Sequence, residues 1–128
     1  MDDTRTSDAL VEVLTTLRDT VAGVGESVIS TGDGLLVAAD ADAVHPESIA
    51  ALAAAALGVG RRLAEQANTG PLRDVVTRCA GGHIMVLAIG DRALLTLVGD
   101  EGLDIVGLQR VIPTTIEQLE KLLAADGG

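Results

Sequence analysis

The 128-residue sequence predicts a mixed α/β (α+β) domain in which helices cover both faces of an antiparallel sheet. The first observation is that apolar residues recur at helical spacing in three segments, separated by short apolar runs with glycine-containing turns between them. The second is that nearly every residue of 84–89 and 94–98 is apolar, as expected of strands covered on both faces. The predicted order is helix, two strands, helix, three strands, helix. Because the length suits one domain, we expect residues 1–128 to form a single domain with its core at about residues 7–125.

The first helix is predicted to begin at Ser7, a residue type that caps helix N-termini, and to close near Gly23. Its apolar stripe repeats every three or four residues and consists of Leu10, Leu14, Leu17 and Val21. Residues 24–30 and 35–39 then predict a hairpin around the turn 31–34, in which Asp33 has a structural role.

The second helix is predicted to begin at Pro46 and to run to about Asn68, before the stop signal of Gly70 and Pro71. One apolar stripe is expected to seat it on the sheet: Ile49, Leu52, Ala56, Val59 and Leu63. A second stripe carries small residues where charges are usual: Ala51, Ala54, Ala55 and Gly58, leading to Arg62. A glycine inside a helix costs about 0.5–1 kcal/mol relative to alanine, so Gly58 and Gly60 indicate close packing against another helix. The alternative is a kink, or packing beneath a loop of the same chain.

Residues 72–79, 83–89 and 93–98 predict three antiparallel strands joined by tight turns at 81–82 and 90–92. The first of them is a natural sheet edge, and an exposed edge of that length is an aggregation hazard unless it is paired or covered. A two-fold dimer would bury this edge and the small-residue stripe together. The predicted dimer interface comprises Ala51, Ala54, Ala55, Gly58, Arg62, Leu72, Asp74, Val76 and Arg78.

The third helix is predicted over residues 103–125, and Asp104 or a neighbour is expected to cap it. Pro113 interrupts the pattern. Either the helix kinks there or it restarts at Thr114, which resembles a capping box with Glu117.

Composition argues against several classes of function. The chain has no Phe, Tyr or Trp and a net charge of −10, so it lacks stacking platforms for bases and repels phosphates; nucleic acid is not expected as a partner. No apolar run approaches the roughly 20 residues that span a bilayer, and the acidic N-terminus is unlike a signal peptide, so we expect a cytoplasmic protein without direct membrane insertion. The single Cys79 cannot form an internal disulfide and is expected to be a buried or half-buried strand residue.

Recognisable catalytic chemistry is also missing. The only lysine is Lys121, far from any glycine loop, so the chain has no P-loop. His45 and His83 lack a second ligand at metal-binding spacing and are expected at the surface or in turns, and no serine lies in a triad context. We therefore expect no catalytic residue, cofactor or metal.

Several local features, taken in order, resemble the roadblock family, which is related to dynein light chains and to bacterial regulators of small GTPases. They are the turn Gly32, Asp33, Gly34 and Leu35 between two strands; the alanine-rich helix through Ala64, Glu65 and Gln66; residues 72–77 followed by Gly81 and Gly82; Gly90 and Asp91 between strands; and an apolar last helix. The resemblance implies a five-stranded antiparallel sheet with the middle helix on one face and the terminal helices on the other. It also implies a homodimer through the middle helix and the adjoining strand.

The resemblance implies a non-catalytic regulator or adaptor that binds a small Ras-like GTPase, with a sensor-kinase-like protein as a further partner and recruitment to a membrane-associated complex. A GTPase-activating role is one version, since an arginine supplied in trans accelerates hydrolysis by roughly 10³–10⁵; Arg61, Arg62, Arg73, Arg78 and Arg92 are available. Two alternatives stay open: a passive scaffold with no effect on hydrolysis, and a small-molecule sensor with an apolar cavity, although no convergent polar groups point to a ligand.

Overall fold

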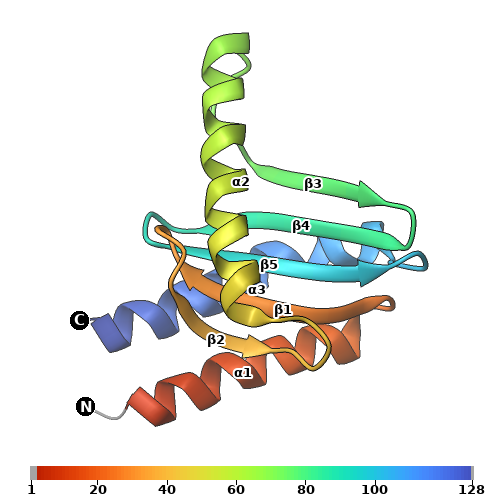
Figure 1. The fold of residues 1–128 in the computed structure, drawn as a ribbon. Coiled ribbons are helices and arrows are strands. Elements are labelled where there is room, and N and C mark those ends of the chain that lie inside the picture. Colours follow the sequence, from red (N-terminus) through yellow and green to blue (C-terminus); the bar gives the residue numbers. More distant parts are fainter. Residues whose placement is uncertain (1–2, 128) are drawn as a thin grey trace.

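The computed structural model describes residues 3–127, and their elements follow the predicted order (Figure 1). The helices are α1 (Asp3–Thr20), α2 (Pro46–Ala67) and α3 (Ile105–Gly127). The strands are β1 (Val24–Thr31), β2 (Leu36–Asp40), β3 (Asp74–Cys79), β4 (Gly82–Ile89) and β5 (Ala93–Asp100).

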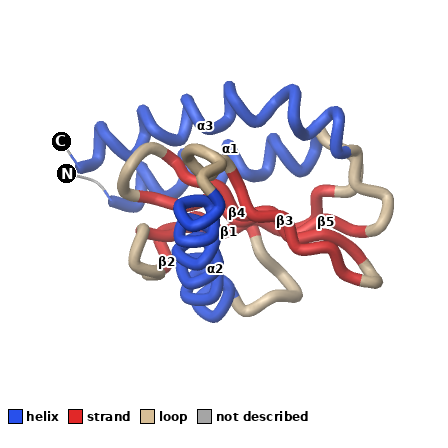
Figure 2. Tube along the Cα trace, turned by 90° about the horizontal axis from the view of Figure 1, so that it is seen from above, coloured by secondary structure: helices blue, strands red, loops and turns tan. Residues whose placement is uncertain are grey.

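The strands form one five-stranded antiparallel sheet in the order β2-β1-β5-β4-β3, so β2 and β3 are its edges. Figure 2 shows three layers, with α1 and α3 on one face of the sheet and α2 on the other. The fold class and the helix placement implied by the resemblance are confirmed.

Two apolar cores fill the space between these layers. The larger lies beneath α1 and α3, where the predicted stripe of α1 is almost completely buried at Leu10, Leu14, Leu17 and Val21. The smaller lies beneath α2 and joins Ala53 and Leu57 to Val86 and Leu94. Because aromatic residues are absent, aliphatic side chains and alanine fill both cores.

The β1–β2 turn matches its prediction. The Thr31 hydroxyl donates to Asp33 Oδ1 (2.5 Å) and accepts from the Leu35 amide (3.0 Å). Gly34 has φ 93°, a left-handed conformation that favours glycine. Asp33 therefore has the structural role that the sequence indicated.

Both terminal helices differ from prediction at one point each. Helix α1 begins at Asp3, so Ser7 lies within the helix and is not its cap. Helix α3 runs from Ile105 through Pro113 as one α-helix, so it does not restart at Thr114. Pro113 and Gln109 are both exposed, so water can reach the carbonyl that proline leaves without a donor. The Asp104 carboxylate accepts from the Gly107 amide (2.9 Å), which confirms it as the cap of α3.

Glu26 holds the connection between β2 and α2 in place. Its Oε1 accepts three backbone N–H groups, from Asp42 (2.6 Å), Ala43 (2.8 Å) and Val44 (3.0 Å). The donors stabilise the carboxylate, so the pKa of Glu26 is lowered, first through Val44 and then Asp42. The anchored segment ends at Val44, two residues before Pro46, and so helps to position the start of α2.

Candidate dimer and partner-binding surface

Helix α2 is seated on the sheet by a different stripe from the predicted one. Ala50, Ala53 and Leu57 are 0%, 4% and 3% exposed, whereas Leu52, Val59 and Leu63 are 67%, 59% and 64% exposed. The prediction that Leu52, Val59 and Leu63 pack on the sheet was therefore wrong. Alanines at the sheet allow a close approach of the helix, and periodicity alone does not say which of two apolar stripes faces inward. The exposed row, together with half-buried Ala56, is called the aliphatic stripe below.

The two helical glycines have different environments. A Cβ at Gly60 would lie 2.9 Å from both Leu72 Cδ2 and Val75 Cγ2, whereas a Cβ at Gly58 would meet nothing within 4 Å. Packing within the chain therefore explains why residue 60 is a glycine, in agreement with the alternative that α2 packs against a segment of its own chain. The same packing does not explain Gly58, where an added Cβ would contact nothing else among the described residues.

The small-residue stripe is split in the same way. A Cβ at Gly34 would lie 3.1 Å from Ala51 Cα and 3.4 Å from Ala54 Cβ, so the β1–β2 turn packs beside this part of α2. Ala54 is half-buried there, whereas Ala51, Ala55, Gly58 and Arg62 are exposed. On helical spacing, the exposed members point away from the sheet, and the aliphatic stripe lies on the side of α2 opposite the turn.

That opposite side faces a part of the sheet that no helix covers. Figure 1 shows α2 crossing the sheet near one end, with β3, β4 and β5 extending beyond it. Thr77, Ile84 and Val98 are on the same sheet face as Val75, Val86 and Leu94, because strand residues alternate between faces. Thr77 is exposed, and Ile84 and Val98 are half-buried. The helix thus covers only part of this face, and we call the remainder the open half.

The C-terminal part of α2 extends past the edge strand β3 (Figure 1). From Arg61 to Ala67 every residue except the half-buried Ala64 is exposed. We call residues 61–67 the overhang. It has no strand of its own chain beneath it.

The predicted interface residues of β3 lie on the other face of the sheet. Asp74, Val76 and Arg78 alternate with Val75, and all three are exposed, Val76 to 46%. Leu72 is half-buried beside Gly60. The structure therefore places Leu72, Asp74, Val76 and Arg78 at the β3 edge, on both of its faces, whereas Ala51 and Ala54 lie beside the β1–β2 turn.

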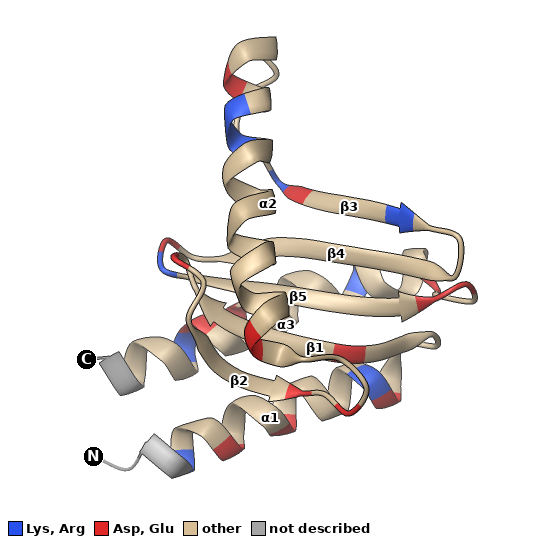
Figure 3. Ribbon diagram, viewed as in Figure 1, with Lys and Arg blue, Asp and Glu red and all other residues tan. Residues whose placement is uncertain are grey.

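The overhang and the β3 edge also carry much of the positive charge of an acidic chain. Figure 3 shows Lys and Arg on the overhang and near both ends of β3. Arg61, Arg62, Arg73 and Arg78 lie between residues 61 and 78, against the carboxylates Glu65 and Asp74. Arg92 is remote, in the β4–β5 turn. The five arginines considered for catalysis in trans are thus not one cluster.

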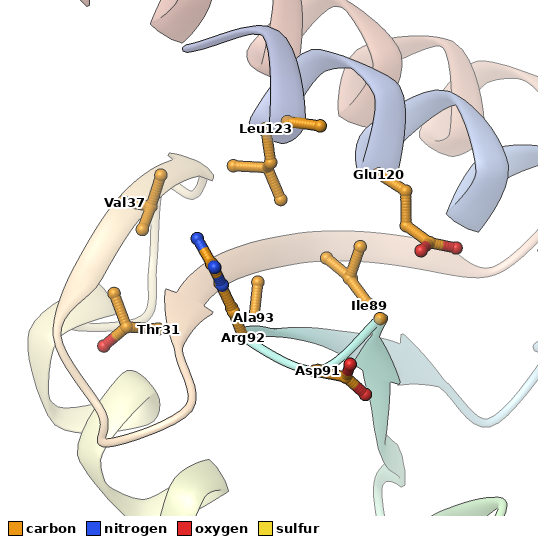
Figure 4. Close-up of a pocket in the computed structure, with 10 residues that line it drawn as sticks. Thr31, Val37, Ile89, Asp91, Arg92, Ala93, Glu120 and Leu123 are labelled. Atoms are coloured by element: carbon orange, nitrogen blue, oxygen red, sulfur yellow. The ribbon is translucent and has the colours of Figure 1, made fainter. Parts of the chain in front are cut away.

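A hollow of about 580 Å³ lies between α3 and the end of the sheet that carries the β1–β2 and β4–β5 turns (Figure 4). Arg92 extends between Val37 and Leu123, while Asp91 and Glu120 lie apart from it. The charged groups do not converge on one point in the space. The hollow therefore gives no support to the small-molecule sensor.

Other chemistry-bearing residues are dispersed. No group of three or more His, Cys, Asp or Glu side chains in the described residues could hold a metal ion. Cys79 is exposed rather than buried, because β3 is an edge strand and α2 does not reach its end. His83 lies at the start of β4, as the predicted strand 83–89 placed it, but it is half-buried and not at the surface. Within residues 3–127, no helix has the length and apolarity to cross a bilayer.

One helix on one face of a five-stranded antiparallel sheet and two on the other define a small α+β domain with an unpaired edge strand. Residues 10–99 match the Roadblock/LC7 domain, and the chain belongs to this family.

Solved structures share the fold. A Roadblock/LC7 domain from Streptomyces avermitilis superposes with a TM-score of 0.82 at 20% identity, over 88% of this chain and 96% of that one. MglB with a tetrameric arrangement gives 0.81 at 20% identity, over 91% and 89%. The gliding protein MglB from Thermus thermophilus gives 0.78 at 20% identity, over 91% and 90%. No curated protein sequence matches the chain significantly.

Proposed function

We propose that the chain is a non-catalytic homodimeric regulator or adaptor that binds a small Ras-like GTPase, with a dimer built through α2 and β3. The observation that carries the dimer is the combination of an overhang with no strand beneath it and an open half of the sheet with no helix above it. A monomer leaves both features in water, together with a row of leucine and valine.

A two-fold axis through the β3 edge joins these features. Pairing β3 with its copy continues the sheet into the partner, and the overhang of each chain then lies over the open half of the other. Ala64 and Ala67 would face the partner's strands, since they share the helix side of Ala53 and Leu57. Their small side chains suit a close approach.

The C-terminal parts of the two aliphatic stripes then face each other across the dimer. Burying a leucine or valine side chain completely is worth about 1.5–3 kcal/mol, and Val59 and Leu63, the stripe residues nearest the β3 edge, are each more than half exposed in one chain. Two-fold symmetry doubles every such contribution. This burial supplies the main apolar driving force of the proposed dimer.

The outward side of α2 supplies the proposed surface for the GTPase. Ala51, Ala55 and Gly58 are exposed there, and two copies would present two such rows of small side chains on one side of a continuous sheet. A flat surface without projecting side chains suits binding by shape rather than catalysis. The regulatory role is the one implied by the roadblock resemblance, and residues 3–127 offer no compact catalytic group that would suggest an enzyme instead.

The dimer is tested by a matched pair of variants, Leu63→Asp and Leu35→Asp, since both side chains are 64% exposed in one chain. Leu35 lies at the β1–β2 turn, outside the proposed contact. In sedimentation equilibrium, Leu63→Asp should weaken the dimer at least 100-fold, because two buried leucines become buried carboxylates. Leu35→Asp should remain dimeric. Equal behaviour of the two variants would contradict the contact through α2.

GTPase binding is tested by affinity capture with the full chain in the presence of GDP or of a non-hydrolysable GTP analogue, followed by mass spectrometry. A small GTPase retained in one nucleotide state supports the proposal, and none in either state overturns it. Single-turnover hydrolysis by the captured GTPase then separates the alternatives: a changed rate identifies a regulator, and an unchanged rate identifies the passive scaffold.

A further inference from the structure

We infer that two copies of this chain pair their β3 strands in one specific register, with Val76 on the two-fold axis and Asp74 opposite Arg78 of the partner copy. This inference rests on the proposed dimer and adds the alignment of its central strands. That alignment sets where each α2 lies on the other chain.

The alternation of side chains between the two sheet faces excludes half of the possible registers. Directly opposite residues of an antiparallel pair point to the same sheet face, and a two-fold axis perpendicular to the sheet keeps faces unchanged. A residue can therefore pair only with itself or with one an even number of positions away. The axis must pass through a residue of β3 and not between two residues.

The position of α2 separates the remaining registers. The helix packs on Val75 and Val86, which are paired, and on Ala88 and Leu94, one step of the pleat earlier. It therefore crosses β3 near position 74. At about 3.3 Å per residue, an axis at Val76 places the two helices about 13 Å apart, while axes at Val75 and Thr77 place them about 7 Å and about 20 Å apart.

Packed helices usually lie about 8–10 Å apart, and the larger separations go with larger side chains. The facing parts carry Val59 and Leu63, which a spacing of about 7 Å, below the usual range, cannot accommodate. A spacing of about 20 Å leaves these side chains apart and in water. The axis at Val76 gives about 13 Å, a few Å above the usual range, and is the one of the three at which large facing side chains have room and still reach each other.

Charge selects the same register independently. Asp74 and Arg78 are the only charged residues of β3, and both are exposed on one face. Neither has a salt-bridge partner in the part of the chain that the structure describes. An axis at Val76 places each Asp74 opposite an Arg78 of the other copy, two ion pairs in all. An axis at Thr77 places Asp74 opposite Ala80 and Arg78 opposite Val76, with no ion pair.

The register is read directly by single cysteines, introduced after Cys79→Ser removes the native thiol. A residue on the axis faces its own copy at about 4.5–5.5 Å between Cα atoms, within disulfide range, whereas its neighbours along the strand face their copies at roughly 8 Å, beyond it. Val76→Cys should therefore give a covalent dimer under mild oxidation, and Val75→Cys and Thr77→Cys should not. A dimer that crosslinks through position 75 or 77 instead would overturn the register while leaving the dimer intact.

Charge exchange gives a second readout that does not depend on oxidation. Asp74→Arg alone and Arg78→Asp alone each put like charges opposite one another twice, and should weaken the dimer by roughly 5- to 30-fold. The double variant Asp74→Arg/Arg78→Asp restores opposite charges and should recover the native affinity. Additive losses in the double variant would contradict the pairing. A wild-type chain that is monomeric in sedimentation would instead contradict the dimer itself.

Discussion

The two glycines of α2, Gly58 and Gly60, can each be changed to alanine, and most contributions to the free energy of unfolding cancel when the two variants are compared. Gly58→Ala and Gly60→Ala add the same methyl group two residues apart in one helix. Each gains about 0.5–1 kcal/mol of helix propensity. At Gly58 the methyl group enters space with no atom within 4 Å, whereas at Gly60 it lies 2.9 Å from Leu72 Cδ2 and Val75 Cγ2.

The difference between the two variants is therefore the overpacking at Gly60. Val75 is β-branched and paired with Val86 in the sheet, so its side chain has little freedom to rotate away. Overpacking of a closely packed site costs about 1–3 kcal/mol. Gly60→Ala should be less stable than Gly58→Ala by this amount, while Gly58→Ala should be slightly more stable than the wild type.

Urea unfolding followed by circular dichroism at 222 nm measures the difference, since a chain without Trp or Tyr offers no intrinsic fluorescence. All three proteins should be compared at one concentration, because the unfolding midpoint of a dimer depends on concentration. Equal stabilities within about 0.5 kcal/mol would refute the reasoning. They would mean that α2 does not sit on Leu72 and Val75 as described.

Three further changes test other parts of the structure. Glu26→Gln weakens three charge-assisted hydrogen bonds to the β2–α2 connection and should cost about 1–3 kcal/mol at pH 7. Because the pKa of Glu26 is lowered in the fold, the stability that its carboxylate contributes is complete above the ordinary value of 4.5 and is lost as the pH falls through the folded pKa. The free energies of unfolding of the wild type and the variant should therefore converge in acid. A difference in stability that does not depend on pH would exclude the carboxylate as the cause. Asp104→Ala removes the cap of α3 and should lower stability by about 0.5–2 kcal/mol in thermal unfolding, with Asp91→Ala, in an exposed turn, as the unaffected control. Gly58→Leu projects from the outward side of α2 and should reduce capture of the GTPase while the dimer mass stays unchanged; a weakened dimer would return Gly58 to the dimer contact predicted from the sequence.

The fold could be predicted largely from sequence because each element carries a local signal. The stripe from Leu10 to Val21 faces the core as its spacing required, and Pro46 opens α2 where a proline can start a helix. Asp104 caps α3 as its position before the helix suggested. Pro113 left a kink and a restart of α3 as alternatives, and the restart was wrong, because an exposed proline can be accommodated in a helix whose free carbonyl is hydrated.

The surface was harder to predict because it depends on which of two apolar stripes faces the sheet. Helical spacing in the sequence indicated that the stripe through Leu52, Val59 and Leu63 faces the sheet. In the structure Ala50, Ala53 and Leu57 face the sheet instead, since alanine allows the backbone to approach the strands closely. The role of Glu26 left no signal at all, because its three donors are backbone groups 16–18 residues away in sequence. Only the folded arrangement brings them together.

The central claim is that two copies of this chain form the functional unit, and the most direct test is its mass in solution. Sedimentation equilibrium with interference optics measures that mass without aromatic absorbance. The account predicts twice the chain mass of 13.0 kDa at micromolar concentration. A mass of 13.0 kDa at all concentrations up to saturation would contradict it, because the overhang, the open half of the sheet and the aliphatic stripe would then have no common partner.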